Sequence, residues 1–159
     1  MNWLNHFLVP STILLILFGD DVSLLAIASF TIMFGILPDS DFIIRRYLLK
    51  NTSRHLRTWV QEPFGIIAIG LPAGLLSALL WEHPYLFLVL VPYVSHVLLD
   101  YLTVHTTFPL TPFSHREFKT GFIRPFNPTP SNPLRPGIFS ENYILLINIL
   151  ILIILMALP

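Results

Sequence analysis

Two ionisable side chains lie inside a long apolar stretch and are the first candidates for chemistry. His96 and Asp100 are four residues apart, and Tyr93 and Thr103 extend the same series in steps of 3, 4 and 3. At about 100° per residue, these four side chains share one helix face, within roughly 80° of one another. An ionisable group in a membrane costs about 2.5–3.5 kcal/mol, so it usually faces a partner, a metal ion or water. The pair is therefore either a set of metal ligands or a His–Asp contact that ties helices together.

The segment Asp39-Ser40-Asp41 directly follows another apolar run and is the second candidate. Pro38 disfavours the α conformation at Leu37, so we expect the preceding helix to end there. Ser40 or Asp39 would then cap the next short helix. Two carboxylates on either side of one serine also suit a hard or borderline cation, which is the alternative interpretation.

Five apolar runs must position these groups, and they cover residues 4–18, 22–37, 64–81, 85–103 and 143–158. A bilayer span needs about 20 apolar residues, with a range of about 17–25. The third and fourth runs are long enough, and the others are slightly short, so the first two form either spans or a shallow hairpin. The sequence predicts an all-α fold, a single membrane-embedded bundle of about five hydrophobic helices over residues 1–159.

The charged residues sort by segment. All nine cations lie in two segments, residues 39–63 and the proline-rich residues 105–142, whereas the turns after the first and third runs carry only Asp20, Asp21 and Glu82. The positive-inside rule makes both basic segments cytoplasmic. We therefore expect a multi-pass protein of the cell (inner) membrane with a cytoplasmic N-terminus. Residues 41–50 predict a short amphipathic helix at the lipid headgroups, and the prolines of residues 109–136 predict a loop.

This topology brings the candidate residues to one face of the membrane. His6 lies at the inner end of the first run, although a lone histidine near a terminus is more often an interfacial residue. Asp39 and Asp41 lie at the inner end of the second run, and His96 and Asp100 lie toward the inner end of the fourth. Imidazoles and carboxylates without sulfur are ligands for zinc, manganese or iron, and we expect zinc first. The predicted site is a divalent metal centre on the cytoplasmic side of the bundle.

His55 lies in the first basic segment, on the same side of the membrane. It is either a further metal ligand or a surface residue.

The composition excludes several classes of protein. Hydrophobic residues make up 54% of the chain and charged residues 11%, with a mean hydropathy of +0.72. These values argue against a water-soluble globule and against a disordered chain. The formal net charge is zero, so no field favours nucleic acid, and the absence of cysteine excludes thiolate sites. Motifs of serine hydrolases, P-loops, dinucleotide-binding folds and HExxH proteases do not occur.

Taken in order, these residues resemble a known family. The order is His6, then Gly35-Ile36-Leu37-Pro38-Asp39-Ser40-Asp41, then a His/Arg-rich segment over residues 54–63, then residues 96–103 with His96 and Asp100. This arrangement, over roughly residues 1–113, resembles the YdjM-type family of membrane-bound, predicted metal-dependent hydrolases, also described as LexA-binding inner-membrane proteins. That family is regarded as remote kin of zinc-dependent phospholipase C and P1 nuclease. One departure is that Gln61 and Leu56 stand where the family pattern has histidines.

The resemblance implies metal-assisted hydrolysis of phosphoester or lipid-linked substrates at the cytoplasmic face of the bilayer. The implied metal ligands are His6, Asp39, Asp41, His55, His96 and Asp100. Asp39 and Asp100 are also the implied catalytic carboxylates, and Arg57 is a candidate for holding a phosphate through two donors.

Two alternatives remain open. Gln61 replaces a histidine of the family pattern. One alternative is therefore that the chain is a catalytically degenerate scaffold that binds a cytosolic protein partner or anionic lipid. A small transporter is the other alternative, because Gly70, Pro72 and Gly74 interrupt the third run while His96 and Asp100 lie within the fourth.

Overall fold

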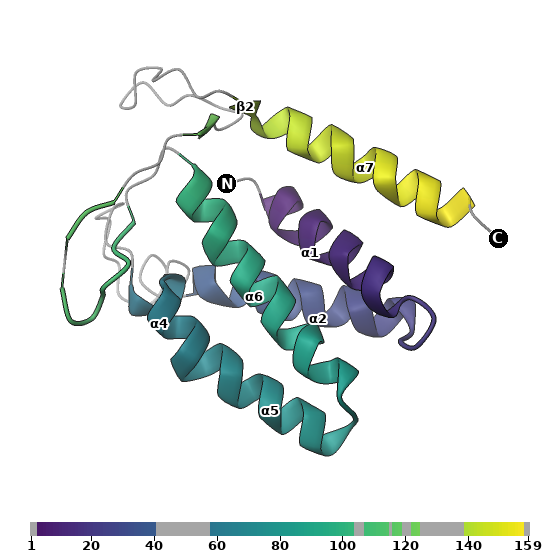
Figure 1. The fold of residues 1–159 in the computed structure, drawn as a ribbon, viewed down its shortest axis with the longest axis horizontal. Helices are drawn as coiled ribbons and strands as arrows, with labels where there is room; N and C mark the ends of the chain where they lie inside the picture. The colour runs from purple at the N-terminus through teal and green to yellow at the C-terminus, as the bar shows by residue number, and fades with distance from the viewer. Residues whose placement is uncertain are drawn as a thin grey trace.

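The computed structural model describes residues 3–40, 58–103, 107–114, 116–118, 122–124 and 139–157. Five helical segments build the bundle (Figure 1). They are α1 (Trp3–Phe18), α2 (Leu24–Ile36), the continuous series α4 (Pro63–Gly65), η3 (Ile66–Gly70) and α5 (Leu71–Leu80), then α6 (Pro84–Leu102) and α7 (Glu141–Ala157). The predicted all-α bundle of about five hydrophobic helices is confirmed.

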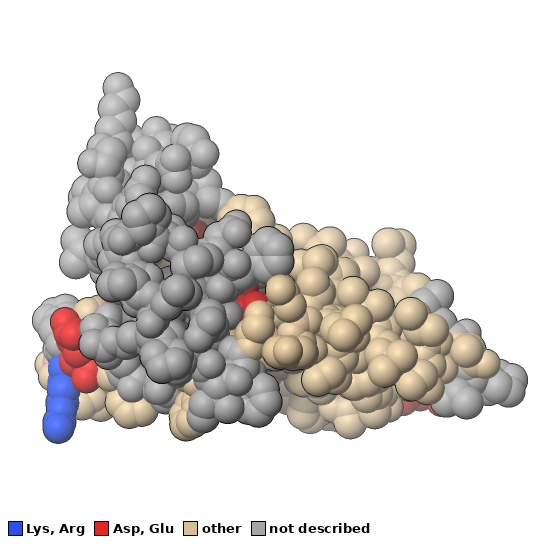
Figure 2. All heavy atoms as spheres, turned by 90° about the horizontal axis from the view of Figure 1, so that it is seen from above, with Lys and Arg blue, Asp and Glu red and all other residues tan. Residues whose placement is uncertain are grey.

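Two of these segments, Pro63–Leu80 and Pro84–Leu102, are long and apolar enough to cross a membrane by length and composition. The other three apolar helices are shorter, as the lengths of the runs predict. Large apolar side chains such as Leu25 and Leu79 are exposed on the outer faces. Figure 2 shows a broad uncharged surface over the right-hand part of the described residues. A surface of this kind suits contact with lipid.

Helix α6 lies at the centre of the bundle and packs against α1, α2 and α5. The last helix, α7, packs on α1, on the side away from α5 (Figure 1). Two buried clusters fill the interior, one of Leu14, Val22, Ile27 and Leu88, and one of Phe34, Val89, Tyr93 and Val97. Helices α5 and α6 approach closely at Gly74, where a Cβ atom would lie 2.9 Å from the Leu86 side chain. This packing fixes α6 between the helices that carry the other candidate residues.

The α-helix α2 ends at Ile36, as predicted from Pro38, but Leu37 stays in the α conformation, so that part of the prediction is wrong. Leu37 keeps helical angles (φ −49°, ψ −43°), and the 3-10 turn η1 (Leu37–Asp39) continues α2. Pro38 is tolerated because the first positions of a helical turn need no N–H donor. The Ser40 hydroxyl donates to the Leu37 carbonyl oxygen at 2.6 Å, which satisfies that carbonyl. Asp39 therefore sits on a helical extension of α2, with its position set by that helix.

The described parts of residues 103–140 contain turns and short strand pairs but no helix, as the prolines predict. Strands β1 (Ile123–Arg124) and β2 (Phe139–Ser140) pair in parallel, and Thr103 forms an isolated bridge with Ile123. The amphipathic helix predicted over residues 41–50, which Ser40 or Asp39 would cap, lies outside the described residues.

Candidate metal centre

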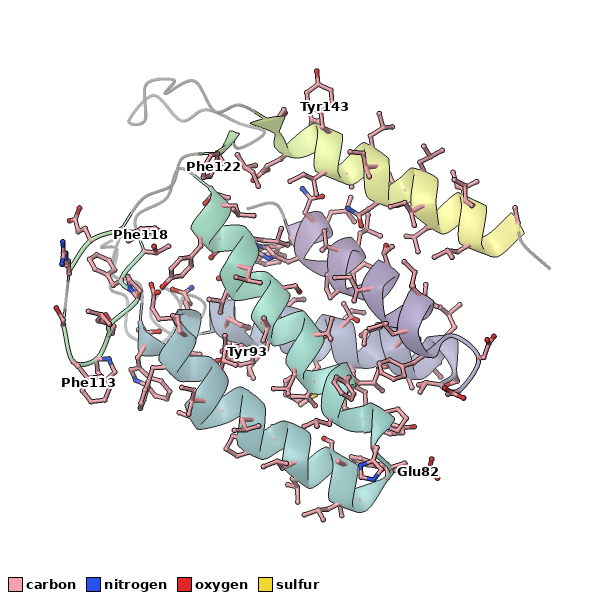
Figure 3. All side chains as sticks on the ribbon, viewed as in Figure 1. Glu82, Tyr93, Phe113, Phe118, Phe122 and Tyr143 are labelled. Carbon is pink, nitrogen blue, oxygen red and sulfur yellow. The ribbon has the colours of Figure 1, made fainter. Side chains whose placement is uncertain are left out.

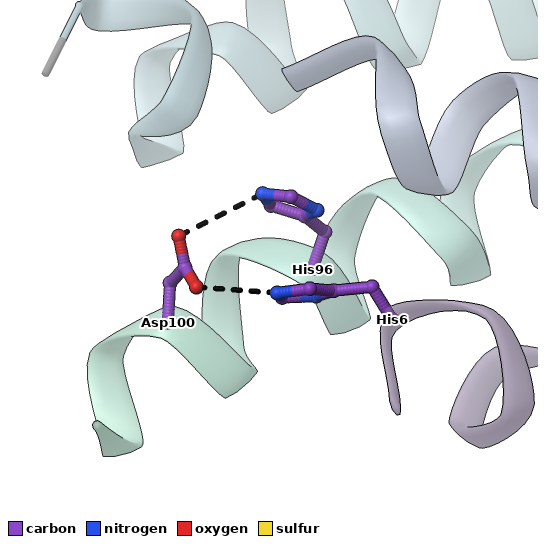
Figure 4. Close-up of side chains that lie close together, drawn as sticks. All are labelled: His6, His96 and Asp100. Carbon is purple, nitrogen blue, oxygen red and sulfur yellow. Dashed lines mark ion pairs between the residues drawn. The ribbon is translucent and has the colours of Figure 1, made fainter. Parts of the chain in front are cut away.

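Three candidate side chains from two helices meet inside the bundle (Figure 4). His6 comes from the start of α1, and His96 and Asp100 come from consecutive turns of α6. All three are buried, with His96 completely enclosed. The two imidazole rings stack, with their centroids 4.0 Å apart and their planes 22° from parallel. Two charged imidazolium rings would repel each other at this distance, so the stacking opposes simultaneous charge on both rings.

The ligand atoms of these residues form a compact set. His6 Nε2 lies 3.3 Å from one carboxylate oxygen of Asp100, and His96 Nε2 lies 3.7 Å from the other. Each residue offers one ligand atom within 4.8 Å of the other two. Asp39 approaches from the end of α2, with its Oδ1 atom 3.5 Å from His96 Nε2. Four predicted site residues from three separate segments are thus brought together.

The protonation of His96 follows from its contact with Gly35. His96 Nδ1 lies 2.7 Å from the Gly35 carbonyl oxygen, which can only accept, so Nδ1 carries the hydrogen. In the neutral ring, Nε2 then presents a lone pair. That atom is buried and has no hydrogen-bond partner among the described residues, although carboxylate oxygens of Asp39 and Asp100 face it. A lone pair aimed at two carboxylates is unfavourable unless a cation or a proton lies between them.

Gly35 is required where α2 passes α1. A Cβ atom at this position would lie 3.0 Å from the backbone carbonyl oxygen of His6. The absence of a side chain therefore lets α2 come close enough for the Gly35 carbonyl to reach His96.

Gln61, which the sequence analysis treated only as a departure from the family pattern, lies beside the site. It ends the short turn η2 (Trp59–Gln61), is buried, and donates from Nε2 to Asp39 Oδ1 at 2.9 Å. The signal that could have found it is its place directly before the third apolar run, at the end of the bundle where the second run finishes.

Neighbouring contacts hold the η2 turn in place. The Tyr93 hydroxyl, between α5 and α6 in Figure 3, donates to the Val60 carbonyl oxygen at 2.8 Å. Glu62 is fully buried and accepts from the Tyr101 hydroxyl at 2.5 Å and from the Phe108 backbone N–H at 2.9 Å. Gln61 therefore sits between two anchored residues.

The remaining predicted residues do not join this group of four in the described part of the chain. Tyr93 and Thr103 are buried on the predicted face of α6, but Tyr93 holds the η2 turn and the Thr103 hydroxyl donates to the Asp100 carbonyl oxygen. Asp41, His55 and Arg57 lie outside the described residues.

The residues present fit a divalent metal ion. A tetrahedral zinc site with bonds of about 2.0–2.1 Å places its ligand atoms about 3.3–3.5 Å apart. The separations of 3.3 and 3.7 Å between the ring nitrogens of His6 and His96 and the carboxylate oxygens of Asp100 are close to this spacing. The Gly35 carbonyl also supplies the hydrogen bond that usually orients a metal-bound histidine through its other ring nitrogen. Two histidines and a carboxylate match zinc, and also suit manganese and iron.

Comparison with known proteins gives one result. A family model described as "YdjM inner membrane protein" matches residues 1–158. No curated protein and no solved structure matches the chain.

Proposed function

We propose that this chain, which belongs to the YdjM inner membrane protein family, is a divalent-metal-dependent hydrolase of phosphoester or lipid-linked substrates. Membership makes it a membrane protein, and the apolar helices of the bundle agree with that. The proposal places the site at the cytoplasmic face, in a multi-pass protein with a cytoplasmic N-terminus. The basic segments, all on one predicted side, support this orientation.

The observation that carries the proposal is the environment of His96 Nε2. Its lone pair is buried, its tautomer is set by Gly35, and carboxylates from two other positions face it. A structural His–Asp pair would place a hydrogen between nitrogen and oxygen, whereas here the hydrogen is committed to the opposite side of the ring. A cation bound by His6, His96 and Asp100 satisfies all of these groups at once.

A divalent ion bound here would supply a lower pKa for a coordinated water and would polarise the scissile group. The chain's own residues determine how a substrate reaches it. His6, His96 and Asp100 are buried, whereas the Asp39 side chain is 23% exposed, so the site opens at Asp39. The sequence following Asp39 carries Arg45, Arg46, Lys50, Arg54 and Arg57, which supports an anionic substrate such as a phosphoester.

The test is elemental analysis of the purified, detergent-solubilised protein. We expect close to one zinc, manganese or iron per chain, and loss of the metal in Asp100→Asn and in His96→Ala. Asp20→Asn and His83→Ala are matched controls, because these residues are exposed in turns away from the cluster. The controls should keep the wild-type metal content.

A folded wild-type protein that contains no metal and does not respond to added zinc, manganese or iron would overturn the proposal. It would leave the non-catalytic scaffold as the better interpretation. Crosslinking of the basic segments to a specific cytosolic partner would then support that alternative.

A further inference from the structure

We propose that Gln61 is a positioning residue that holds Asp39 beside the metal as a proton acceptor and keeps it from becoming a metal ligand. This inference rests on the proposed function and assigns separate roles within that site. The family resemblance implies that Asp39 is both a metal ligand and a catalytic carboxylate. The contacts of the carboxylate separate these roles.

The ligand atoms of three of the four residues lie close together. His6, His96 and Asp100 form the mutually close set, and Asp39 is not a member of it. Two imidazoles and one carboxylate are a sufficient protein ligand set for catalytic zinc, which keeps a further position open for water or substrate. A fourth protein ligand would close that position, as in structural zinc sites.

Asp39 accepts a hydrogen bond from Gln61. Gln61 Nε2 donates to Oδ1, the same oxygen that lies 3.5 Å from His96 Nε2. This hydrogen bond of 2.9 Å holds the oxygen in place and occupies one of its lone pairs. Asp39 is also the one partly exposed member of the four residues, with 23% of its side chain exposed, whereas the other three are buried.

Gln61 lies between two residues that are held by hydrogen bonds. Tyr93 holds the preceding carbonyl at Val60, and Tyr101 and Phe108 hold the following side chain at Glu62. The turn also packs tightly on Gly65, where a Cβ atom would lie 2.3 Å from the Val60 carbonyl oxygen. These contacts hold the residues on both sides of Gln61, which limits how far its amide could follow Asp39 toward the metal.

The hydrolysis step in which Asp39 accepts a proton needs no reactant other than water and the phosphoester. Asp39 takes one proton from the attacking water as the water oxygen forms the new phosphorus–oxygen bond. The ester phosphorus–oxygen bond breaks, its electron pair stays on the leaving oxygen, and the proton held by Asp39 is passed to that oxygen.

The test compares cobalt binding with hydrolysis in the detergent-solubilised full chain, using Co²⁺ as the metal probe and bis-(p-nitrophenyl) phosphate as the substrate probe. Asp39→Asn keeps an oxygen that accepts from Gln61 but removes the basic group. We expect its Co²⁺ affinity to stay within about threefold of wild type, while Asp100→Asn weakens binding by more than about 100-fold. Hydrolysis should fall by about 10²–10⁴-fold in Asp39→Asn.

Gln61→Met removes the amide donor at similar length and frees Asp39 to turn. We expect the visible spectrum of bound Co²⁺ to change as Asp39 joins the coordination, and hydrolysis to fall, with no loss of Co²⁺ affinity. In the double variant Gln61→Met with Asp39→Asn, the spectrum should return to that of wild type. A general disturbance of the turn would not be reversed in this way. Asn148→Leu, which removes an amide bonded within α7, is the matched control and should match wild type in every measurement.

Loss of Co²⁺ in Asp39→Asn to the extent seen in Asp100→Asn would show that Asp39 is a ligand and would overturn the inference. An unchanged spectrum in Gln61→Met would overturn it as well. If Gln61→Met fails to fold, the comparison of Asp39→Asn with Asp100→Asn still decides. Absence of Co²⁺ and of other divalent metals from wild type is a separate result, which overturns the proposed function itself.

Discussion

His96 donates its Nδ1 hydrogen to the carbonyl oxygen of Gly35 across 2.7 Å, although the two residues are 61 positions apart. The same glycine lies against the backbone of His6, so one position on α2 controls the placement of both histidines. A hydrogen bond of this kind orients a metal-binding imidazole and fixes which nitrogen is available. Four predictions follow from this and from related contacts.

Gly35→Ala should damage the site without changing any ligand. The added Cβ would lie 3.0 Å from the His6 carbonyl oxygen, so α1 and α2 must move apart. We expect a loss of about 1–3 kcal/mol of stability from overpacking. Zinc affinity should fall by about 10–100-fold as the bond to His96 weakens. Thermal unfolding and zinc titration in detergent measure the two effects.

Gly70→Ala is the matched control for that substitution. A Cβ atom at Gly70 would make ordinary contacts of 3.5 Å with the Tyr93 ring. It should change neither zinc affinity nor stability by much, and equal zinc binding by both variants would contradict the role given to Gly35.

Zinc should stabilise the folded protein. A ligand that binds only the folded state at 100 times its Kd adds about 2.7 kcal/mol, so the Tm should rise with zinc and fall with a chelator. His6→Ala should abolish this response, whereas the exposed His83→Ala should retain it. A zinc response that survives in His6→Ala would place the ion elsewhere.

Glu62→Leu should destabilise the chain without removing a ligand. The substitution takes away the acceptor used by the Tyr101 hydroxyl and the Phe108 N–H, at a cost of about 1–3 kcal/mol for each buried group that finds no replacement. Glu62→Gln keeps one acceptor oxygen and should be milder. Glu82→Leu, in the exposed turn before α6, should be nearly neutral in the same unfolding measurement.

Asn5→Leu should loosen the last helix. The Asn5 side chain donates to the backbone oxygen of Glu141 at 3.2 Å and joins the start of α1 to the start of α7. Its removal should cost about 0.5–1.5 kcal/mol and speed amide hydrogen exchange in α7. In Asn148→Leu, the lost bond lies within α7, so exchange should increase only near that residue. Equal exchange in both variants would show that Asn5 does not fix α7.

Much of the fold and part of the site could be predicted from the sequence because the signals were local. Long apolar runs predict the five helices within a few residues, and the spacing of His96 and Asp100 predicts their common face on α6. The one-sided placement of charges then indicates that His6 and Asp39 belong at the same end of the bundle, where the structure brings them together.

The rest depends on contacts between distant residues and on weak local preferences. The conformational preference of Leu37 before proline is small, and the Ser40 hydrogen bond and a 3-10 turn override it. Gln61 contacts Asp39 because the turn before α4 is held in place by the hydrogen bond from the Tyr93 hydroxyl to the Val60 carbonyl oxygen. The place of Gln61 directly before the third apolar run indicates its end of the bundle, but a single amide carries no periodicity, so its contact with Asp39 could not be predicted from the sequence alone.

The ligand set has a consequence for biosynthesis. His6 is synthesised first, but His96 and Asp100 emerge only after α2 and the whole helical segment Pro63–Leu80 have been made. His6 therefore lacks these two partners until α2, the segment Pro63–Leu80 and α6 have been synthesised. A nascent chain halted after α5 would lack two members of the set. Binding of the proposed metal ion would thus be a late step of assembly, coupled to the arrival of α6 between α1 and α2.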